Sequence, residues 1–175
     1  MKIALLGYGK MGQVIEKIAL QRGHEIVVRK SIEDSFDGLD NSEVAIEFSA
    51  PDAAVENISA ALNLGIPVIS GTTGWLHDYD KMVQLCNKKN SAFISSSNFS
   101  LGVNIFFELN EKLAKMMHQL EEYNISMEEI HHTKKLDAPS GTAITLAEGI
   151  IKNSDKKSWA LNVTNNENQI PIIAK

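Results

Sequence analysis

The strongest constraint on the fold is a glycine-rich segment, Gly7-Tyr8-Gly9-Lys10-Met11-Gly12, placed between an expected strand and an expected helix. The strand is Lys2 to Leu6, a short apolar run, and a helix follows because apolar residues from Met11 to Ala19 recur at helical spacing. The first glycine permits a tight turn, the second lets a pyrophosphate approach the backbone, and the third lets helix and strand pack closely. The segment therefore predicts a dinucleotide-binding site, and the alternative is a glycine-rich turn without a ligand.

Short strand-like runs alternate with helical patterns through the first half of the chain. Further strands are expected at residues 25–28, 44–48, 67–70 and 92–95, with helices at 51–64 and 77–89 between them. Because β-α-β alternation builds a parallel sheet with helices on both faces, residues 1–101 are expected to form a Rossmann-type α/β dinucleotide-binding domain. Residues 102–175 differ: a long helix at 103–120, a helix at 142–152, and strands at 124–130, 158–163 and 169–173 predict an α+β second domain.

The residues at the end of the second strand bear on the choice of cofactor. An acid there would accept the ribose 2′-hydroxyl of NADH, but the sequence has Arg29 and Lys30, which can pair with the 2′-phosphate of NADPH. We therefore expect NADPH, with NADH not excluded. The alternative is that both cations are solvated loop charges.

Two loops follow the fourth and fifth strands, where an open parallel sheet places its ligand crevice. They are Gly71-Thr72-Thr73-Gly74 and Ser97-Asn98-Phe99-Ser100, which follows Ser96. Their small residues and hydroxyls are candidates to contact a nicotinamide and its ribose. For the first loop, a turn with a helix cap explains the same residues.

The segment from His131 to Thr142 contains most of the candidate chemistry: two histidines, two lysines, an acid and a hydroxyl pair. Ser140, Gly141 and Thr142 begin a helix after Pro139, so their N–H groups and hydroxyls predict a carboxylate site. His131 or Lys135 can supply a proton near neutral pH. One histidine at a strand end is usually structural, but cations converging on a helix N-terminus favour an anion site.

The order of these motifs resembles the dihydrodipicolinate reductase family. The residues that carry it are the glycine-rich segment, Gly71 to Gly74, Asn98 to Asn104, and Glu129 to Ala143, and the likeness covers the whole chain. It implies an NAD(P)H-dependent oxidoreductase that reduces a small cyclic dicarboxylate to tetrahydrodipicolinate in lysine and diaminopimelate biosynthesis. It also implies a second domain built on an open mixed sheet, and a homotetramer.

The resemblance carries roles to individual positions. His131 matches the proton donor, Lys135 its partner in protonation and substrate binding, and His132, Ser140, Gly141 and Thr142 the contacts to substrate carboxylates. Contacts to the cofactor fall on the glycine-rich segment (Gly7, Gly9, Lys10, Met11, Gly12), on Arg29 and Lys30, and on the two loops (Gly71, Thr72, Thr73, Ser96, Ser97, Asn98, Phe99).

Two departures from the family pattern stand out. Thr133 and Lys134 replace more basic residues, which is a minor change. Family members continue beyond the last expected strand, so we expect the second domain to be truncated, with Ile170, Ile172 and Ile173 at or near an open sheet edge. This leaves one alternative function, a nucleotide-binding fragment without turnover. A homoserine dehydrogenase is disfavoured, because the paired histidines and the Pro-Ser-Gly-Thr run do not belong to that pattern.

Composition excludes several other classes. A net charge of −5 gives no general attraction for nucleic acid, and no apolar run is long enough to cross a bilayer. The single cysteine, Cys86, cannot form an intramolecular disulfide, which favours the cytoplasm. We expect no metal site and no membrane partner.

Overall fold

The structure, a computed structural model, describes residues 1–120, 122–131 and 138–175. It divides into two compact units, Met1–Ser97 and Asn98–Lys175, which are described separately. The sequence placed this boundary after Leu101. In the described part of the chain, no helix is long and apolar enough to cross a membrane.

The first unit is built around a five-stranded parallel sheet. Its strands are β1 (Lys2–Leu6), β2 (Glu25–Lys30), β3 (Val44–Glu47), β4 (Val68–Ser70) and β5 (Phe93–Ser95), in the order β2-β1-β3-β4-β5. The strand order reverses direction between β1 and β3, and a crevice outside the carboxyl ends of the strands is expected at such a point. The predicted α/β class, with a parallel sheet in the first half, is confirmed.

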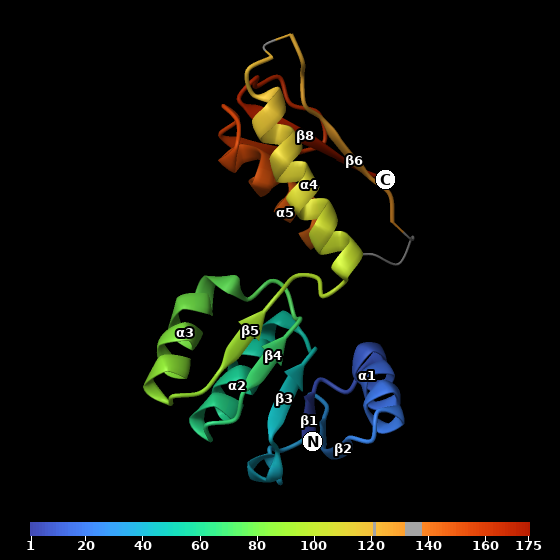
Figure 1. Ribbon diagram of the computed structural model, residues 1–175, viewed down its shortest axis with the longest axis vertical. Coiled ribbons are helices and arrows are strands. Elements are labelled where there is room, and N and C mark those ends of the chain that lie inside the picture. Colours follow the sequence, from blue (N-terminus) through green and yellow to red (C-terminus); the bar gives the residue numbers. More distant parts are fainter. Residues whose placement is uncertain (121, 132–137) are drawn as a thin grey trace. The chain divides into compact units, whose positions relative to one another are not determined.

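Helices cover both faces of this sheet (Figure 1): α1 (Lys10–Gln21) lies on one face, and α2 (Pro51–Asn63) and α3 (Tyr79–Lys88) lie on the other. β1 supplies both cores because successive side chains point to opposite faces. Ile3 and Leu5 pack on the α1 side, whereas Ala4 and Leu6 pack on the α2 side. Two short 3₁₀ helices, Leu39–Asn41 and Leu76–Asp78, complete the unit.

The second strand differs from its prediction in a way that bears on the cofactor. β2 runs to Lys30, so both expected loop cations lie within it. A register shift against β1, between Ile3 and Ala4, pairs Ala4 with Val28, Leu5 with Arg29 and Leu6 with Lys30. Because Leu5 packs on the α1 side and Leu6 on the α2 side, Arg29 and Lys30 point to opposite faces of the sheet.

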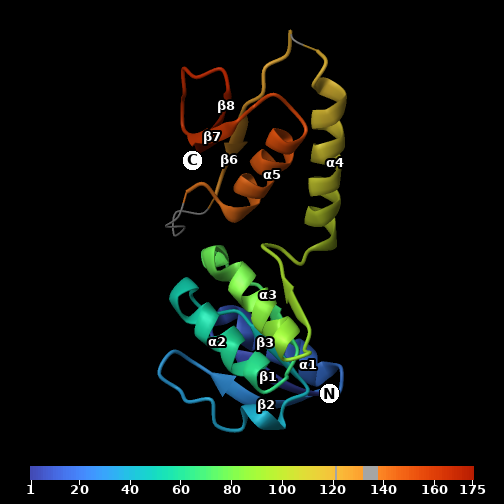
Figure 2. The ribbon, with the colours of Figure 1, turned by 90° about the vertical axis from the view of Figure 1, so that its left-hand side faces the viewer.

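The second unit contains a three-stranded parallel sheet in the order β6-β8-β7, formed by β6 (Met127–Glu129), β7 (Ser158–Leu161) and β8 (Gln169–Ala174). The helices α4 (Leu101–Met117) and α5 (Gly141–Lys152) lie side by side (Figure 2). Ala114 of α4, Ile150 of α5 and Ile170 of β8 share one buried cluster, so both helices contribute to the core over the sheet.

Ile170, Ile172 and Ile173 were expected at or near an open sheet edge, but they lie on the central strand of the described sheet. β8 is the central described strand, flanked by β6 and β7, and both Ile170 and Ile172 are fully buried. Ile170 and Ile172 point to the same face of the sheet, where they pack with α4 and α5. Pro171 and Ile173, on the other face, are half-buried.

Candidate functional site

The glycine-rich loop of the first unit has the close backbone contacts that its pattern predicts. A Cβ atom on Gly7 would lie 2.0 Å from the carbonyl oxygen of Phe48, and one on Gly12 would lie 2.3 Å from that of Gly7. Gly7 has a φ of 108°, a backbone conformation that residues other than glycine rarely adopt. Gly9, in contrast, faces open space, with no atom within 4 Å of a Cβ placed on it. The loop is therefore packed tightly at both ends and open in the middle, where a pyrophosphate would approach the protein backbone.

Two cavities adjoin this loop. The larger, of about 650 Å³, is bounded by residues 7–9, by 30–34 after β2, by 48–50 after β3, and by Ala53 and Asn57 of α2; we call it the nucleotide crevice. The smaller, of about 350 Å³, brings residues 9–11 together with Gly71, Thr72 and Thr73. The structure thus places the glycine-rich loop beside the loop after β4, as the sequence analysis expected.

The N-terminus of α1 fits an anionic group. Its N-cap residue is Gly9, which offers no side-chain cap, and its first turn contains no acid. Lys10 and Met11 are exposed beside it and line the smaller cavity. Backbone N–H groups that no side chain caps, at the positive end of a helix, suit a phosphate. The donor set and the open side of Gly9 therefore fit a dinucleotide pyrophosphate.

A buried acidic side chain, absent from the predicted site residues, contacts the walls of both cavities. Glu47, at the end of β3, has no solvent exposure. Its Oε1 accepts hydrogen bonds from the Ser49 N–H at 3.0 Å, from the Ser49 hydroxyl, and from Thr72 Oγ1 at 2.8 Å. Its Oε2 accepts one from Ser70 Oγ at 2.6 Å. Because Ser49 borders the nucleotide crevice and Thr72 the smaller cavity, Glu47 holds the walls of both in place.

Side-chain partners extend this network in two directions. Trp75, fully buried, donates its indole N–H to the Thr72 carbonyl oxygen at 2.8 Å. Asn57 donates its amide to Ser49 Oγ at 3.2 Å, and among the described residues its buried Oδ1 has no partner. Glu47 directly follows the apolar residues of β3 and gives no sequence signal of this role, because its donors come from residues up to 25 positions away.

The two cations expected at the 2′-phosphate have different surroundings. Lys30 is 6% exposed, borders the nucleotide crevice, donates to the Ser31 carbonyl oxygen at 3.1 Å, and places Nζ 4.7 Å from the centre of the Phe36 ring. Arg29 is not among the residues that border the crevice. It donates Nε to Glu16 Oε1 at 2.8 Å, with a second contact through Nη2. Two acids, Glu33 and Asp34, also border the crevice, whereas the cofactor prediction rested on Arg29 and Lys30 alone.

The loop after β5 is partly placed by backbone contacts. Ser96 donates its N–H to the Ser70 carbonyl oxygen at 3.1 Å, which continues the β4–β5 pairing. Asn98 accepts a hydrogen bond from the Ser100 N–H through Oδ1 at 2.8 Å, at the start of α4. Ser97 is the last residue of the first unit, and Asn98 and Phe99 belong to the second.

In the second unit, the described part of the His131–Thr142 segment borders a cavity of about 230 Å³. Its wall includes His131 and Glu129 from the end of β6, Ser140 and Thr142 at the start of α5, and Ile172 of β8. The structure therefore brings the candidate proton donor to the N-terminus of α5. His132 and Lys135 lie outside the described residues, as do Thr133 and Lys134.

Glu129 connects His131, which follows β6, to Ser140 at the start of α5. Its Oε2 lies 3.0 Å from His131 Nε2, and its Oε1 accepts the Ser140 N–H at 2.8 Å. Burial raises the pKa of this carboxyl, but hydrogen bonds from Ser140 and His131 outweigh that effect, so the pKa lies below its ordinary value. Glu129 is therefore anionic near neutral pH, and it orients the His131 ring. In the sequence, Glu129 is visible only as part of the motif Glu-x-His, and this spacing by itself does not indicate that Glu129 orients the histidine.

Ser140 has a structural task in addition to the predicted one. It is the N-cap of α5, with its hydroxyl oxygen accepting the Ala143 N–H at 3.1 Å, and it is 6% exposed. Its side chain also hydrogen-bonds to the Glu129 carboxylate. Gly141 and Thr142 are only half-buried. Among the described residues, no group of three or more His, Cys, Asp or Glu side chains is placed to hold a metal ion.

Comparison with known proteins gives matches over both units. Residues 1–99 match the family model described as dihydrodipicolinate reductase, N-terminus, and residues 102–174 match the one described as dihydrodipicolinate reductase, C-terminus. A 4-hydroxy-tetrahydrodipicolinate reductase of Christiangramia forsetii is 55% identical over 100% of this chain and 74% of its own length. One from Archaeoglobus fulgidus is 35% identical over 90% of this chain and 67% of its own length.

A solved structure has the same fold. It is a dipicolinate-bound dihydrodipicolinate reductase from Paenisporosarcina sp. TG-14, with a TM-score of 0.65 and 23% sequence identity, covering 99% of this chain and 77% of that one.

The buried Glu47 network leads to a first prediction. In Glu47→Gln the side chain keeps its shape, but its amide nitrogen donates, so at least one of the hydroxyls of Ser49, Ser70 and Thr72 loses its acceptor. A buried polar group without a partner costs about 1–3 kcal/mol, and we expect the free energy of unfolding to fall by about that amount. Urea unfolding followed by circular dichroism measures it.

The matched control is Glu56→Gln, the same change at an exposed position of α2. A Glu47→Gln protein as stable as this control would contradict the role assigned to the network.

Proposed function

The chain belongs to the dihydrodipicolinate reductase family, and from this we propose that it reduces 4-hydroxy-tetrahydrodipicolinate, by way of dihydrodipicolinate, to tetrahydrodipicolinate. It is an NAD(P)H-dependent oxidoreductase of lysine and diaminopimelate biosynthesis. The single strongest support is that both units match the family, residues 1–99 and 102–174. The alternative, a nucleotide-binding fragment without turnover, has no comparable support.

We propose that the first unit holds the dinucleotide. When bound, this cofactor supplies a hydride to the substrate. The N–H groups at the start of α1 bind its pyrophosphate, together with Gly7, Gly9, Lys10, Met11 and Gly12. Gly71, Thr72 and Thr73 contact the nicotinamide end, and the segment Ser96 to Phe99 adds further contacts.

We propose that the second unit binds the substrate and supplies the proton. The substrate is a small cyclic dicarboxylate, so it needs donors for two carboxylates. Ser140, Gly141 and Thr142 at the N-terminus of α5 bind one of them, with His132 as a further contact. His131 gives up the proton, with Lys135 as its partner, and the anionic Glu129 holds the His131 ring in place.

We also propose the cytoplasm as its location, because the one cysteine cannot form a disulfide within the chain and the pathway is biosynthetic.

The preferred cofactor is proposed to be NADPH, with Arg29 and Lys30 as the cations for its 2′-phosphate. Lys30 supports this most directly, because it borders the nucleotide crevice. Arg29→Gln is expected to weaken NADPH binding by about tenfold, since it removes one charge-assisted hydrogen bond to the phosphate, and to change NADH binding little. Calorimetric titration of both cofactors at fixed salt measures this. Equal wild-type affinities for NADPH and NADH would refute the preference.

The roles in the second unit are separated by their kinetics. His131→Gln is expected to lower kcat by about 10²- to 10⁴-fold, as expected for loss of a positioned proton donor, with a smaller change in KM. Thr142→Val keeps the shape of the side chain but removes its hydroxyl, so it is expected mainly to raise KM. Steady-state NADPH oxidation, followed by absorbance, measures both. If His131→Gln changed only KM and Thr142→Val only kcat, the two roles would be exchanged.

We propose a homo-oligomer, a tetramer by family resemblance. Large apolar side chains of α4 are solvent-exposed, among them Leu109 and Leu113 at 57% and 58%, and they suit an interface between copies. Size-exclusion chromatography with light scattering is expected to give the mass of more than one chain. A monomer at micromolar concentration would contradict this proposal.

A further inference from the structure

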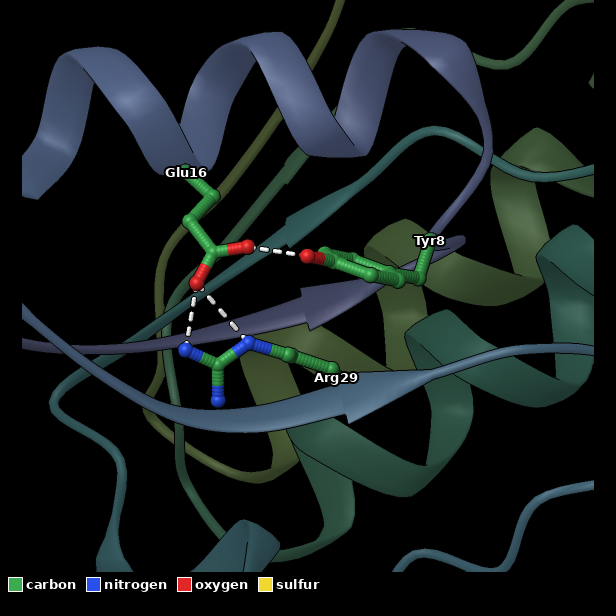
Figure 3. A network of polar contacts seen from close by, with 3 residues as sticks. All are labelled: Tyr8, Glu16 and Arg29. Atoms are coloured by element: carbon green, nitrogen blue, oxygen red, sulfur yellow. Dashed lines mark hydrogen bonds and ion pairs between the residues drawn. The ribbon is translucent and has the colours of Figure 1, made fainter.

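A three-residue network joins the glycine-rich loop to α1 and β2 (Figure 3). Tyr8 of the loop donates its hydroxyl to Glu16 Oε2, and Arg29 of β2 donates Nε and Nη2 to Glu16 Oε1. In Figure 3 the phenol and the guanidinium both point toward the carboxylate, which comes from α1. The Glu16 side chain is 14% exposed, and that of Arg29 is 43% exposed. Glu16 is therefore the shared acceptor of a tyrosine and an arginine.

This network lies between the nucleotide crevice and the end of β2. Tyr8 itself borders the nucleotide crevice, so the network begins at the crevice wall. Arg29 is the penultimate residue of β2, the region where this kind of site distinguishes a ribose 2′-hydroxyl from a 2′-phosphate. The register shift in β2 turns Arg29 to the α1 side, and there Glu16 meets it.

The contact between Glu16 and Arg29 affects the ionisation of both side chains. The Arg29 guanidinium and the Tyr8 hydroxyl lower the pKa of the Glu16 carboxyl, and Glu16 in turn raises the pKa of Arg29, so the pair is fully ionised near neutral pH. One negative and one positive charge then cancel at a distance of a few ångströms. The charged residues that border the crevice itself are one cation, Lys30, and two acids, Glu33 and Asp34. Without Glu16, the Arg29 charge would be uncompensated.

We propose that Glu16 is a specificity-determining residue for the cofactor: by neutralising and restraining Arg29, it limits the preference for NADPH and lets the same site accept NADH. The inference rests on the proposed role of Arg29 at the 2′-phosphate. A neutral ribose 2′-hydroxyl needs no uncompensated cation, whereas a phosphate binds more tightly as net positive charge rises. Glu16 therefore acts through Arg29 and is a positioning residue, with no contact to the reacting atoms required.

The test is a titration of the 175-residue chain with NADPH and with NADH, by calorimetry at fixed ionic strength. In Glu16→Gln, the ratio of the NADH to the NADPH dissociation constant is expected to rise about five- to tenfold, mainly through tighter NADPH binding, because one negative charge near the phosphate is removed. Raising the salt concentration should reduce the rise, since the effect is electrostatic. A purely structural role for Glu16 would weaken both cofactors together and leave the ratio unchanged.

Two further variants complete the design. Glu25→Gln makes the same charge change at an exposed position at the other end of β2, and it should leave the ratio unaltered. In the double variant Glu16→Gln/Arg29→Gln, the rise should disappear, because Glu16 is proposed to act through Arg29.

The outcomes separate this inference from the proposal on which it rests. If Arg29→Gln alone weakens NADPH but Glu16→Gln leaves the ratio within twofold of wild type, or lowers it, the Glu16 inference is overturned and the Arg29 site stands. If Arg29→Gln alone does not affect NADPH binding, both are overturned. A rise in Glu16→Gln that persists in the double variant also overturns the inference, because Arg29 would not transmit it.

Discussion

The buried carboxylate of Glu47 is the interaction on which the nucleotide half of the molecule depends. It accepts hydrogen bonds from residues that follow β3 and from the end of β4 and the loop after it, so it ties the ends of two neighbouring strands together. A carboxylate without solvent contact is costly unless its oxygens are satisfied, and here several donors satisfy them. The same hydrogen bonds set the positions of Ser49 and Thr72, which line the two cavities beside the glycine-rich loop. Stability and site geometry therefore share one group.

The second unit uses a carboxylate in a related way. Glu129 ends β6 and accepts the N–H of Ser140 at the start of α5, so it links a strand to a helix. Its other oxygen lies beside His131, which links the candidate proton donor to the same helix. In both units an acid at the carboxyl end of a parallel strand holds a loop that lines a cavity. The two differ in exposure, because Glu47 is enclosed and Glu129 borders its cavity.

The helices and strands that could be predicted are those whose sequence signal lies within the element itself or beside it. β1 and the order of strands and helices in the first unit follow from apolar runs and glycine stops, and they agree with the structure. Two features did not follow. The register shift in β2 turns Arg29 to the α1 side and Lys30 to the α2 side, and no residue pattern marks it, because it arises from pairing with β1. The central place of β8 was also missed, since an apolar strand has the same sequence whether one or both of its edges are paired.

The sequence by itself determined the family, the α/β class and the position of the glycine-rich loop, because each depends on residues close together in the chain or on a long specific motif. Only the tertiary structure decided which charges meet. Glu16 reaches Arg29 and Tyr8, and Glu47 reaches Thr72, across separations of 8 to 25 positions that helical or strand periodicity does not encode. Hydrogen bonds and ion pairs act over a few ångströms, so their partners are set by how the strands pair and the helices pack.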